Sequence, residues 1–223
     1  MTAPASTASD KVYLGIMRDI EDRRMVPGQR LVETDLAARY GVGRNAVREA
    51  MQRLATRGIA DLKPNHSPAI RFLDDAEVLE VLEVAEYMTA LAARLAACRF
   101  DARIHGAMLD DAMAQLGAMD SDSPYGAFGR ARRRFYRTLL HIGGNRELQR
   151  IFPAVGTHLI FSQFHSPKLQ KVRLADYKRI SDAVAAGDGN AAEAAGRVHT
   201  RAVRRIISQL MDVDAADSQI IEA

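Results

Sequence analysis

Two arginines and an asparagine follow a glycine turn in a pattern that suits contact with nucleic acid. The run Gly41–Gly43 directly precedes Arg44, Asn45 and Arg48, and the two arginines are four residues apart. If a helix begins near Arg44, both arginines share one of its faces. Arginine can pair with guanine edges or phosphates, and asparagine can pair bidentately with adenine. Gly43 and the first helical N–H groups could also approach a phosphate closely.

The surrounding pattern predicts the elements that would hold these side chains at a surface. Residues 11–23 and 34–40 have helical apolar spacing, and residues 44–57 continue it after the glycine turn. The expected buried stripe of that last helix comprises Val47, Ala50, Met51 and Leu54. Residues 59–62 and 69–72 flank a tip of proline and polar residues, which predicts a β-hairpin. A winged helix-turn-helix is therefore expected.

Charge is distributed unevenly along the chain. Residues 1–73 hold 12 Lys and Arg against 8 Asp and Glu, whereas the other 150 residues hold 19 against 20. A basic first segment favours a polyanionic partner, although an ordinary solvated surface would also explain it. The helix spacing likewise fits a generic three-helix bundle with solvated arginines. Charge and spacing alone therefore leave two interpretations open.

Particular residue strings favour DNA binding. Over residues 11–73 the chain resembles the GntR family of bacterial regulators, on PGQRL (27–31), Leu36-Ala37, GVGRNAVREAMQRLATRGI and the wing KPNHS. The resemblance implies that the DNA contacts fall on Thr34, Gly43, Arg44, Asn45, Ala46 and Arg48, with Asn65, His66 and Ser67 in the wing. The family usually has Ser, Pro and Gly where this chain has Gly43, Ala46 and Ser67. The missing hydroxyl at position 43 is expected to remove one phosphate contact.

Beyond Leu73 the pattern changes to longer amphipathic helices. They are expected at 76–99, 103–118, 126–142, 146–164, 169–186 and 190–211. In the first of them the apolar side chains expected to face the core are Leu79, Leu82, Met88, Leu91, Leu95 and Cys98. This remainder resembles the FCD effector domain of the FadR-type branch of the family. The expected fold is mainly α, with the winged helix-turn-helix followed by an all-helical bundle.

These patterns also set the expected domain boundaries. They are a disordered tail at 1–10, the DNA-binding domain at 11–73, a linker at 74–76, the effector-binding and dimerisation domain at 77–212, and a C-terminal tail at 213–223. The resemblance implies a homodimer that binds a palindromic DNA operator. A small metabolite in the helical domain would change the affinity for that operator, and repression is the family's usual mode.

Many FCD domains hold a metal ion through one Asp and three His, and this chain departs from that set. Arg132 stands for the Asp, Tyr136 and Tyr177 stand for the first two His, and His199 remains. A divalent metal needs several anionic or imidazole donors, whereas a guanidinium offers no acceptor and adds positive charge. We therefore expect no metal cofactor. Arg132 is expected to bind an anionic metabolite directly, with Tyr136, Tyr177 and His199 around it.

Two alternatives compete with a ligand-responsive regulator. Arg132 could fill the site, reaching solvent or pairing with a carboxylate such as Glu83 or Glu86, which would leave a DNA-binding regulator that senses nothing. The second alternative is an enzyme whose active site lies in the helical domain. The sequence has no P-loop, nucleophile elbow, paired carboxylates or HExxH motif, so an enzyme is not expected.

Cysteine usage and hydropathy limit the compartment. The single cysteine, Cys98, excludes an internal disulfide framework and fits a reducing cytoplasm. No apolar stretch approaches the ~18 residues that a membrane span needs. The first ten residues lack the basic and apolar regions of a signal peptide. A cytoplasmic protein with no membrane partner is therefore expected.

Overall fold

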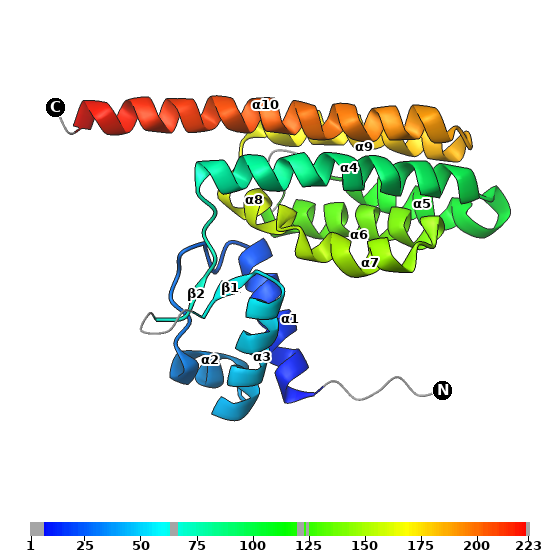
Figure 1. The fold of residues 1–223 in the computed structure, drawn as a ribbon. Coiled ribbons are helices and arrows are strands. Elements are labelled where there is room, and N and C mark those ends of the chain that lie inside the picture. The colour runs from blue at the N-terminus through cyan, green and yellow to red at the C-terminus, as the bar shows by residue number, and fades with distance from the viewer. Residues whose placement is uncertain (1–6, 63–66, 120–122, 124, 222–223) are drawn as a thin grey trace. The chain divides into compact units, whose positions relative to one another are not determined.

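The computed structural model describes residues 7–62, 67–119, 123 and 125–221. The chain forms two compact units (Figure 1). The first unit contains the chain up to Leu73 together with His158–Gln163, and the second contains Asp74–Thr157 and Phe164–Ala223. Among the described residues, no helix is both long enough and apolar enough to cross a membrane.

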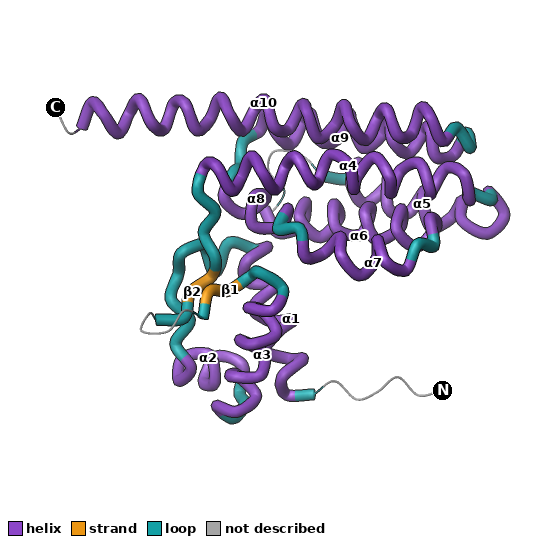
Figure 2. The backbone as a smooth tube through the Cα atoms, in the orientation of Figure 1, coloured by secondary structure: helices purple, strands orange, loops and turns teal. Residues whose placement is uncertain are grey.

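The first unit is a winged helix-turn-helix, as predicted. Its helices are α1 (Ala8–Glu21), α2 (Glu33–Tyr40) and α3 (Arg44–Thr56), and its hairpin consists of β1 (Ala60–Asp61) and β2 (Ala69–Ile70) (Figure 2). The strands are antiparallel, with Ala60 opposite Ile70 and Asp61 opposite Ala69. The side chains that form its core include Val12, Ile16, Ile20, Leu36, Val47, Met51, Leu54, Ile59 and Ile70, all buried.

Helix α1 begins earlier than its apolar spacing predicts. The hydroxyl of Thr7 accepts a hydrogen bond from the N–H of Asp10, and the carboxylate of Asp10 accepts one from the N–H of Thr7. This reciprocal capping box satisfies backbone donors that the first turn of a helix leaves open. The helix therefore starts at Ala8, inside the tail expected at residues 1–10.

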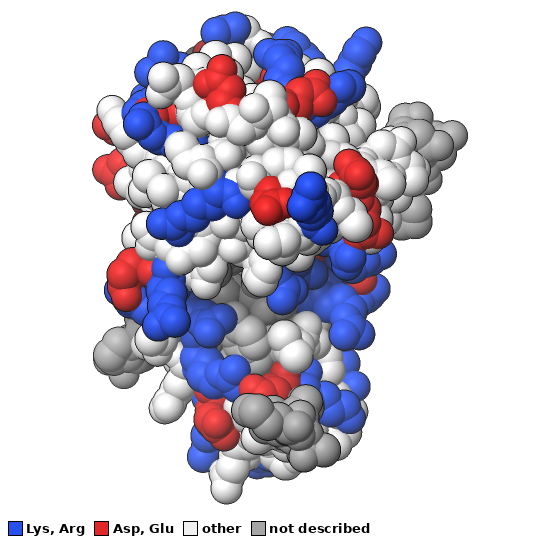
Figure 3. Space-filling view, turned by 90° about the vertical axis from the view of Figure 1, so that its right-hand side faces the viewer, with Lys and Arg blue, Asp and Glu red and all other residues white. Residues whose placement is uncertain are grey.

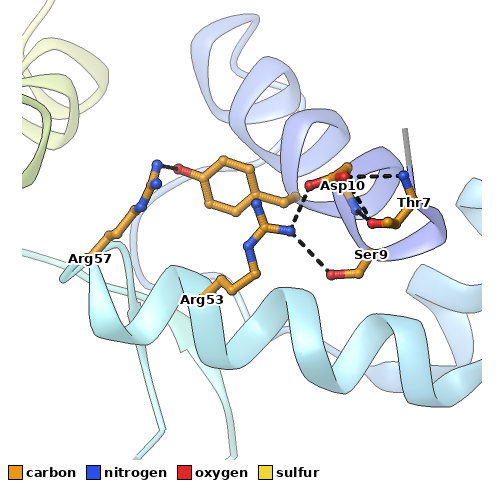
Figure 4. A network of polar contacts seen from close by, with 6 residues as sticks. Thr7, Ser9, Asp10, Arg53 and Arg57 are labelled. Atoms are coloured by element: carbon orange, nitrogen blue, oxygen red, sulfur yellow. Dashed lines mark hydrogen bonds and ion pairs between the residues drawn. The ribbon is translucent and has the colours of Figure 1, made fainter. Parts of the chain in front are cut away.

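Polar contacts join α1 to α3 (Figure 4). The guanidinium groups of Arg53 and Arg57 lie 4.8 Å and 5.1 Å from the ring centre of Tyr13, and Arg57 donates a 2.7 Å hydrogen bond to the Tyr13 hydroxyl. Arg53 also donates to Asp10 at 2.8 Å and to Ser9 at 3.2 Å. The hydrogen bond from Arg53, supported by those from Thr7, lowers the pKa of Asp10 to about 2. These contacts fix the helix that carries the exposed arginines.

A short helix from later in the chain forms hydrogen bonds with Leu73, the last residue of the N-terminal segment of the first unit. The side-chain amide of Gln163, at the end of α8 (Thr157–Gln163), donates to the carbonyl of Leu73 at 2.9 Å. The side-chain oxygen of Gln163 accepts from the N–H of Leu73 at 3.1 Å. His158–Gln163 therefore belongs to the first unit. The predicted boundaries had placed these residues in the helical domain of residues 77–212.

The second unit is all-helical, as predicted. Its remaining elements are α4 (Asp75–Arg99), α5 (Ala102–Gly117), α6 (Tyr125–Gly143), α7 (Arg146–Ile151), the 3-10 turn η1 (Phe152–Ala154), α9 (Pro167–Ala185) and α10 (Gly189–Ile221). Figure 1 shows α10 running beside α4 and α9, and α6 packs against α4 and α5. The side chains that pack between α4, α6 and α7 are Ala92, Leu140 and Leu148, with Met88, Leu95 and Phe152 around them.

Small residues form much of the inner face of α4, together with Leu82, a predicted large residue that is buried. The residues with little or no exposure there include Ala85, Ala90, Ala92, Ala93, Ala96 and Ala97. On α10, a Cβ atom at Gly196 would lie 3.0 Å from the Cα of Ala90. Leu91 and Cys98, predicted to face the core, are instead exposed. Periodicity favoured the larger side chains, but the close approach of α10 selects the alanine face.

Two helices of the second half of the chain differ from their predicted extents. The helix expected at 146–164 is divided into α7, η1 and α8, because Pro153 and Gly156, whose φ is 87°, interrupt it. Helix α10 continues to Ile221, beyond the expected end at 211 and into the expected tail at 213–223. No Gly or Pro occurs between residues 197 and 221 to end it.

Candidate nucleic-acid interface and effector site

The turn between α2 and α3 leaves the start of α3 open. Gly41 ends α2 with a φ of 62°, a left-handed conformation that glycine adopts without steric cost. Gly43 is the N-cap of α3 in an extended conformation, and among the described residues no side chain caps this helix. Its first N–H groups therefore remain available to an anion, where the helix dipole also favours negative charge.

In the first turns of α3, core residues lie on one face of the helix and exposed polar residues lie on the other. Val47 and Met51 face the core, while Arg44, Asn45 and Arg48 are exposed. The other predicted contact residues of this region differ in exposure: Gly43 is exposed, Ala46 is half-buried, and Thr34 is exposed with its hydroxyl donating to Asp35 at 3.2 Å. In the wing, Ser67 is exposed, and the predicted contacts Asn65 and His66 lie outside the described residues.

A carboxylate on α2 holds one of the exposed arginines. The Nε of Arg48 donates to both oxygens of Glu33, at 2.8 Å and 2.9 Å. This hydrogen bond lowers the pKa of Glu33, and Arg44 contributes through its charge. Glu33 and Arg48 are 15 positions apart on different helices. Sequence reasoning missed Glu33, because no local spacing links it to α3.

A buried acid on α1 fixes the orientation of α2. Asp19 accepts hydrogen bonds from the Tyr40 hydroxyl at 2.7 Å and from Arg24 at 2.8 Å, and Arg39 lies 2.7 Å from it. Burial alone would raise the pKa of Asp19, but the bonds from Tyr40 and Arg24 outweigh it and the pKa lies below its ordinary value. Gly15 leaves room for the Tyr40 ring, since a Cβ there would lie 2.5 Å from it.

Basic side chains gather on the face of the first unit that Figure 3 presents, with few acidic side chains among them. An excess of positive charge attracts a polyanion and speeds its encounter with the surface. The excess of Lys and Arg over Asp and Glu in residues 1–73 is therefore visible on the surface of the unit that contains α3.

The four predicted effector residues lie together in the second unit. The Nε of Arg132, on α6, donates to the hydroxyl of Tyr177, on α9, at 3.2 Å. The guanidinium of Arg132 also lies 5.0 Å from the ring centre of Tyr136. The ring centre of Tyr177 is 5.7 Å from that of Tyr136 and 4.9 Å from that of His199, on α10. Three helices thus bring these side chains into one cluster.

Two further charged residues in this cluster were missed by sequence reasoning. Asp176 and Arg173 are both buried on α9, and Oδ2 of Asp176 lies 3.2 Å from Nδ1 of His199. The sequence pattern could have predicted these two residues, because positions 173 and 176 lie on the same helical face as the apolar residues Leu169 and Ile180. Charged residues on an expected core stripe indicate a buried polar site.

Burial and charge set the protonation of the cluster. Burial raises the pKa of the Tyr136 hydroxyl, and the neighbouring Tyr177 adds to this effect. Burial lowers the pKa of His199, and Arg173 and Arg132 lower it further, against the opposing effect of Asp176. The imidazole is therefore uncharged near neutral pH, and the positive charge of the cluster resides on its arginines.

The donor set of this cluster does not fit a divalent metal. Asp176 and His199 could serve as ligands, but Arg132 and Arg173 act electrostatically on the same imidazole and would repel a cation. Within the described ranges, no group of three or more His, Cys, Asp or Glu side chains is arranged around a common point for a metal. The arrangement suits an anion better than a cation.

Comparison with known proteins identifies the family. Residues 8–70 match the bacterial regulatory proteins of the gntR family, and residues 80–202 match the FCD domain. The chain belongs to the gntR family of regulators that contain an FCD domain. This gntR-family protein is therefore a DNA-binding transcription regulator and not an enzyme. Of the alternatives raised by the sequence, the enzyme is excluded.

Several relatives of this gntR-family regulator match over most of their length. An uncharacterized HTH-type transcriptional regulator of Streptomyces ambofaciens is 27% identical over 195 residues, covering 86% of this chain and 81% of the relative. The HTH-type transcriptional regulator LutR of Bacillus subtilis is 27% identical, covering 85% and 96%. A probable D-xylose utilization operon transcriptional repressor of Paenarthrobacter nicotinovorans is 24% identical, covering 88% and 87%.

Solved structures of gntR-family proteins have the same fold. Escherichia coli McbR/YncC superposes with a TM-score of 0.78 at 16% identity, covering 92% of this chain and 99% of that one. A GntR-type regulator from Rhodococcus superposes with a TM-score of 0.72 at 21% identity, covering 90% and 97%. At these identities the likeness concerns the fold of the gntR-family regulator alone.

Proposed function

We propose that this regulator binds a palindromic DNA operator as a homodimer, and that a small anionic metabolite in the second unit changes its affinity for that operator. The observation that carries the proposal is the start of α3, where Arg44, Asn45 and Arg48 are exposed together and no described side chain caps the helix. An N-terminal turn of this kind can enter the major groove and contact base edges. Because the target DNA is in the cytoplasm, the regulator acts there.

A selected DNA sequence tests the DNA-binding part of the proposal. The wild-type chain would be used to select duplexes from a randomised library, and the affinity for the selected duplex would be measured against salt. Arg44→Ala and Arg48→Ala are each expected to abolish sequence-specific binding while the dimer persists. Removing an arginine that neutralises one phosphate should reduce the slope of log K against log salt by ~0.9. Unchanged affinity in both variants would contradict this use of α3.

An apolar stripe on α4 supports the homodimer. Val84, Tyr87 and Leu91 follow one another at helical spacing, and their exposed fractions are 50%, 60% and 42%. Val198, on the adjacent α10, is 49% exposed. Large apolar side chains gathered on one face favour contact with a second protein surface. A second copy of the chain would bury this stripe isologously, and two DNA-binding units would then match the two-fold symmetry of a palindrome.

Sedimentation tests the stripe as the dimer contact. Leu91→Glu places a charge on the stripe, and we expect it to convert the dimer to a monomer and to weaken operator binding. Ile104→Glu is the matched control, since Ile104 is a 71% exposed apolar residue on α5, outside the stripe. If Leu91→Glu sediments like the wild type, another surface forms the dimer.

The cluster on α6, α9 and α10 supports an anionic effector. Arg132 and Arg173 contribute guanidinium groups. Arg132 donates to the Tyr177 hydroxyl and lies over the Tyr136 ring, and His199 lies against Tyr177. A guanidinium can pair bidentately with a carboxylate or a phosphate. We therefore propose a small organic acid or another anionic metabolite as the effector, bound without a metal cofactor.

Thermal stability in the presence of organic acids tests the effector site. A ligand that binds only the folded protein, present at about 100 times its Kd, should add about 2.7 kcal/mol to the free energy of unfolding. Arg132→Ala should remove that stabilisation. Arg137→Ala is a matched control, because Arg137 is an exposed arginine on the same helix. Both variants should bind the selected duplex in the absence of ligand.

The alternative is a regulator whose effector site is filled by its own side chains. Glu86, one suggested partner of Arg132, is bonded to Arg201 at 2.9 Å and lies 3.7 Å from Arg197. The hydrogen bond from Arg132 to Tyr177 fits either a filled or an occupied site. If no organic acid stabilises the wild type or changes its DNA affinity, this alternative replaces the effector proposal. For the sign of regulation we propose repression, as in the relative named as a repressor.

A further inference from the structure

The ion pair between Glu33 and Arg48 uses only one edge of the guanidinium. Both carboxylate oxygens accept from Nε, at 2.8 Å and 2.9 Å. Among the described residues, no hydrogen-bond partner is found for the two Nη atoms of Arg48. These two atoms form the end of the guanidinium fork, which pairs with the O6 and N7 atoms of guanine. Glu33 therefore holds Arg48 from the side and leaves its base-reading end open.

The position of Glu33 makes this contact a rigid one for a surface pair. Glu33 is the first residue of α2, and its side chain is 31% exposed, whereas that of Arg48 is 62% exposed. Helix α2 is itself fixed to α1 by the contacts of Tyr40 and Arg39 with buried Asp19. A long arginine side chain loses rotamer entropy when it must be ordered for binding. Holding it on a fixed carboxylate reduces that loss before DNA arrives.

The charge of Glu33 acts on phosphates as well as on arginines. Glu33 lies within electrostatic range of both Arg48 and Arg44. It therefore offsets part of the positive charge that these arginines present to the DNA backbone. Attraction to phosphates supplies most non-specific affinity and is independent of sequence. A carboxylate between the arginines should lower that component, while the contact of Arg48 with a base keeps its full value.

We propose that Glu33 is a positioning residue that sets the sequence specificity of the regulator, by aiming Arg48 at a base and weakening attachment to phosphates alone. This inference rests on the proposed function, in which α3 enters the major groove. In this proposal Glu33, on α2, contributes to DNA recognition without contacting a base itself. Substitution of Glu33 should therefore change the ratio of the affinities for specific and non-specific DNA, and should not abolish DNA binding.

The test compares two DNA duplexes with the full-length protein. One is the duplex selected by the wild type from a randomised library, and the other is a scrambled duplex of the same composition. Glu33→Gln should bind the scrambled duplex more tightly and with a steeper salt dependence. The ratio of selected to scrambled affinity should fall about tenfold, the lower range for one bidentate base contact. This loss of preference should be concentrated at one base pair of the selected duplex, the one that Arg48 contacts.

Two further variants separate positioning from charge. Glu49→Gln removes the same charge from an exposed position on α3, next in sequence to Arg48, and no contact between Glu49 and Arg48 is found in the described structure. It should raise both affinities equally and leave their ratio unchanged. Glu33→Asp keeps the charge but shortens the side chain. It should leave the scrambled affinity near that of the wild type and still reduce the preference at the base pair of Arg48.

The possible results distinguish this inference from the proposed function. A wild-type chain with no preference for any duplex would contradict the proposed DNA reading itself. A wild type with a preference, and a Glu33→Gln variant with the same ratio of affinities, would overturn the role of Glu33 alone. A Glu33→Gln variant that melts at a lower temperature and loses all DNA binding would make Glu33 a folding residue, and would also overturn the inference.

Discussion

The Nδ1 atom of His199 lies 3.2 Å from the carboxylate of Asp176, and neither side chain is accessible to more than a few per cent. On its other side the imidazole lies against Tyr177, with ring centres 4.9 Å apart. Arg173 and Arg132 act on the same imidazole. His199 is therefore a buried base that is held uncharged, although a carboxylate lies beside it, because burial and two cations outweigh that carboxylate.

This arrangement predicts that stability falls in mild acid. The pKa of His199 in the folded protein lies below its ordinary value of 6.5, so above that pH both folded and unfolded chains hold a neutral imidazole. As the pH falls below 6.5, the unfolded chain binds the proton first, and the free energy of unfolding decreases. Melting temperatures from about pH 8 to about pH 5 should show this decrease. His199→Gln should show a smaller slope, and an unchanged slope would contradict the assignment.

Gly196 should be intolerant of a larger side chain. A Cβ there would lie 3.0 Å from the Cα and 3.1 Å from the N of Ala90, which are backbone atoms of α4. Gly196→Ala should lower the free energy of unfolding by about 1–3 kcal/mol, as overpacking does. Gly106→Ala, in α5 with nothing within 4 Å, is the control. It should raise stability by about 0.4–1 kcal/mol. Denaturant titrations of both variants measure the difference.

Tyr13 should couple α1 to α3 through its hydroxyl. Tyr13→Phe removes the acceptor of the 2.7 Å bond from Arg57 but keeps the ring beneath Arg53. The free energy of unfolding should fall by about 0.5–1.5 kcal/mol. A double-mutant cycle with Arg57→Ala should show a coupling energy of about 0.5 kcal/mol or more. Additive losses would mean that the two side chains do not stabilise each other.

Gln163 should stabilise the end of the first unit through both of its amide atoms. Gln163→Leu removes the acceptor for the N–H of Leu73 and the donor for the carbonyl of Leu73, and Leu73 itself is only 1% exposed. The expected loss is about 1–3 kcal/mol, because buried backbone groups lose their partners. Gln163→Glu keeps an acceptor and removes the donor, so its loss should be intermediate. Equal stability of all three proteins would show that solvent replaces these bonds.

Local features of the sequence were sufficient to predict the elements of the first unit. The glycine at 41 and the apolar stripe Val47, Met51 and Leu54 define where α3 begins and which face it buries. Helical periodicity then requires Arg44 and Arg48 to be exposed. The start of α1 differed because the capping box of Thr7 extends the helix beyond its apolar spacing.

The second unit was predicted less completely. Substitutions within a recognised pattern led to Arg132, Tyr136, Tyr177 and His199, which lie together as expected. The inner face of α4 was assigned to large apolar residues, yet Leu91 and Cys98 are exposed and alanines are buried. Periodicity shows that a helix has a buried face, but the distance to the neighbouring helix decides which side chains fit there.

The sequence by itself determined most of the helices, the turn before α3 and the exposed arginines, and it led to the side chains of the effector cluster. Only the tertiary structure decided the partners across helices: Glu33 beside Arg48, and Asp176 beside His199. The physical reason is that local patterns depend on neighbours within a few residues, where helix geometry fixes distances. Contacts between residues 15 or 23 positions apart depend instead on how whole helices pack.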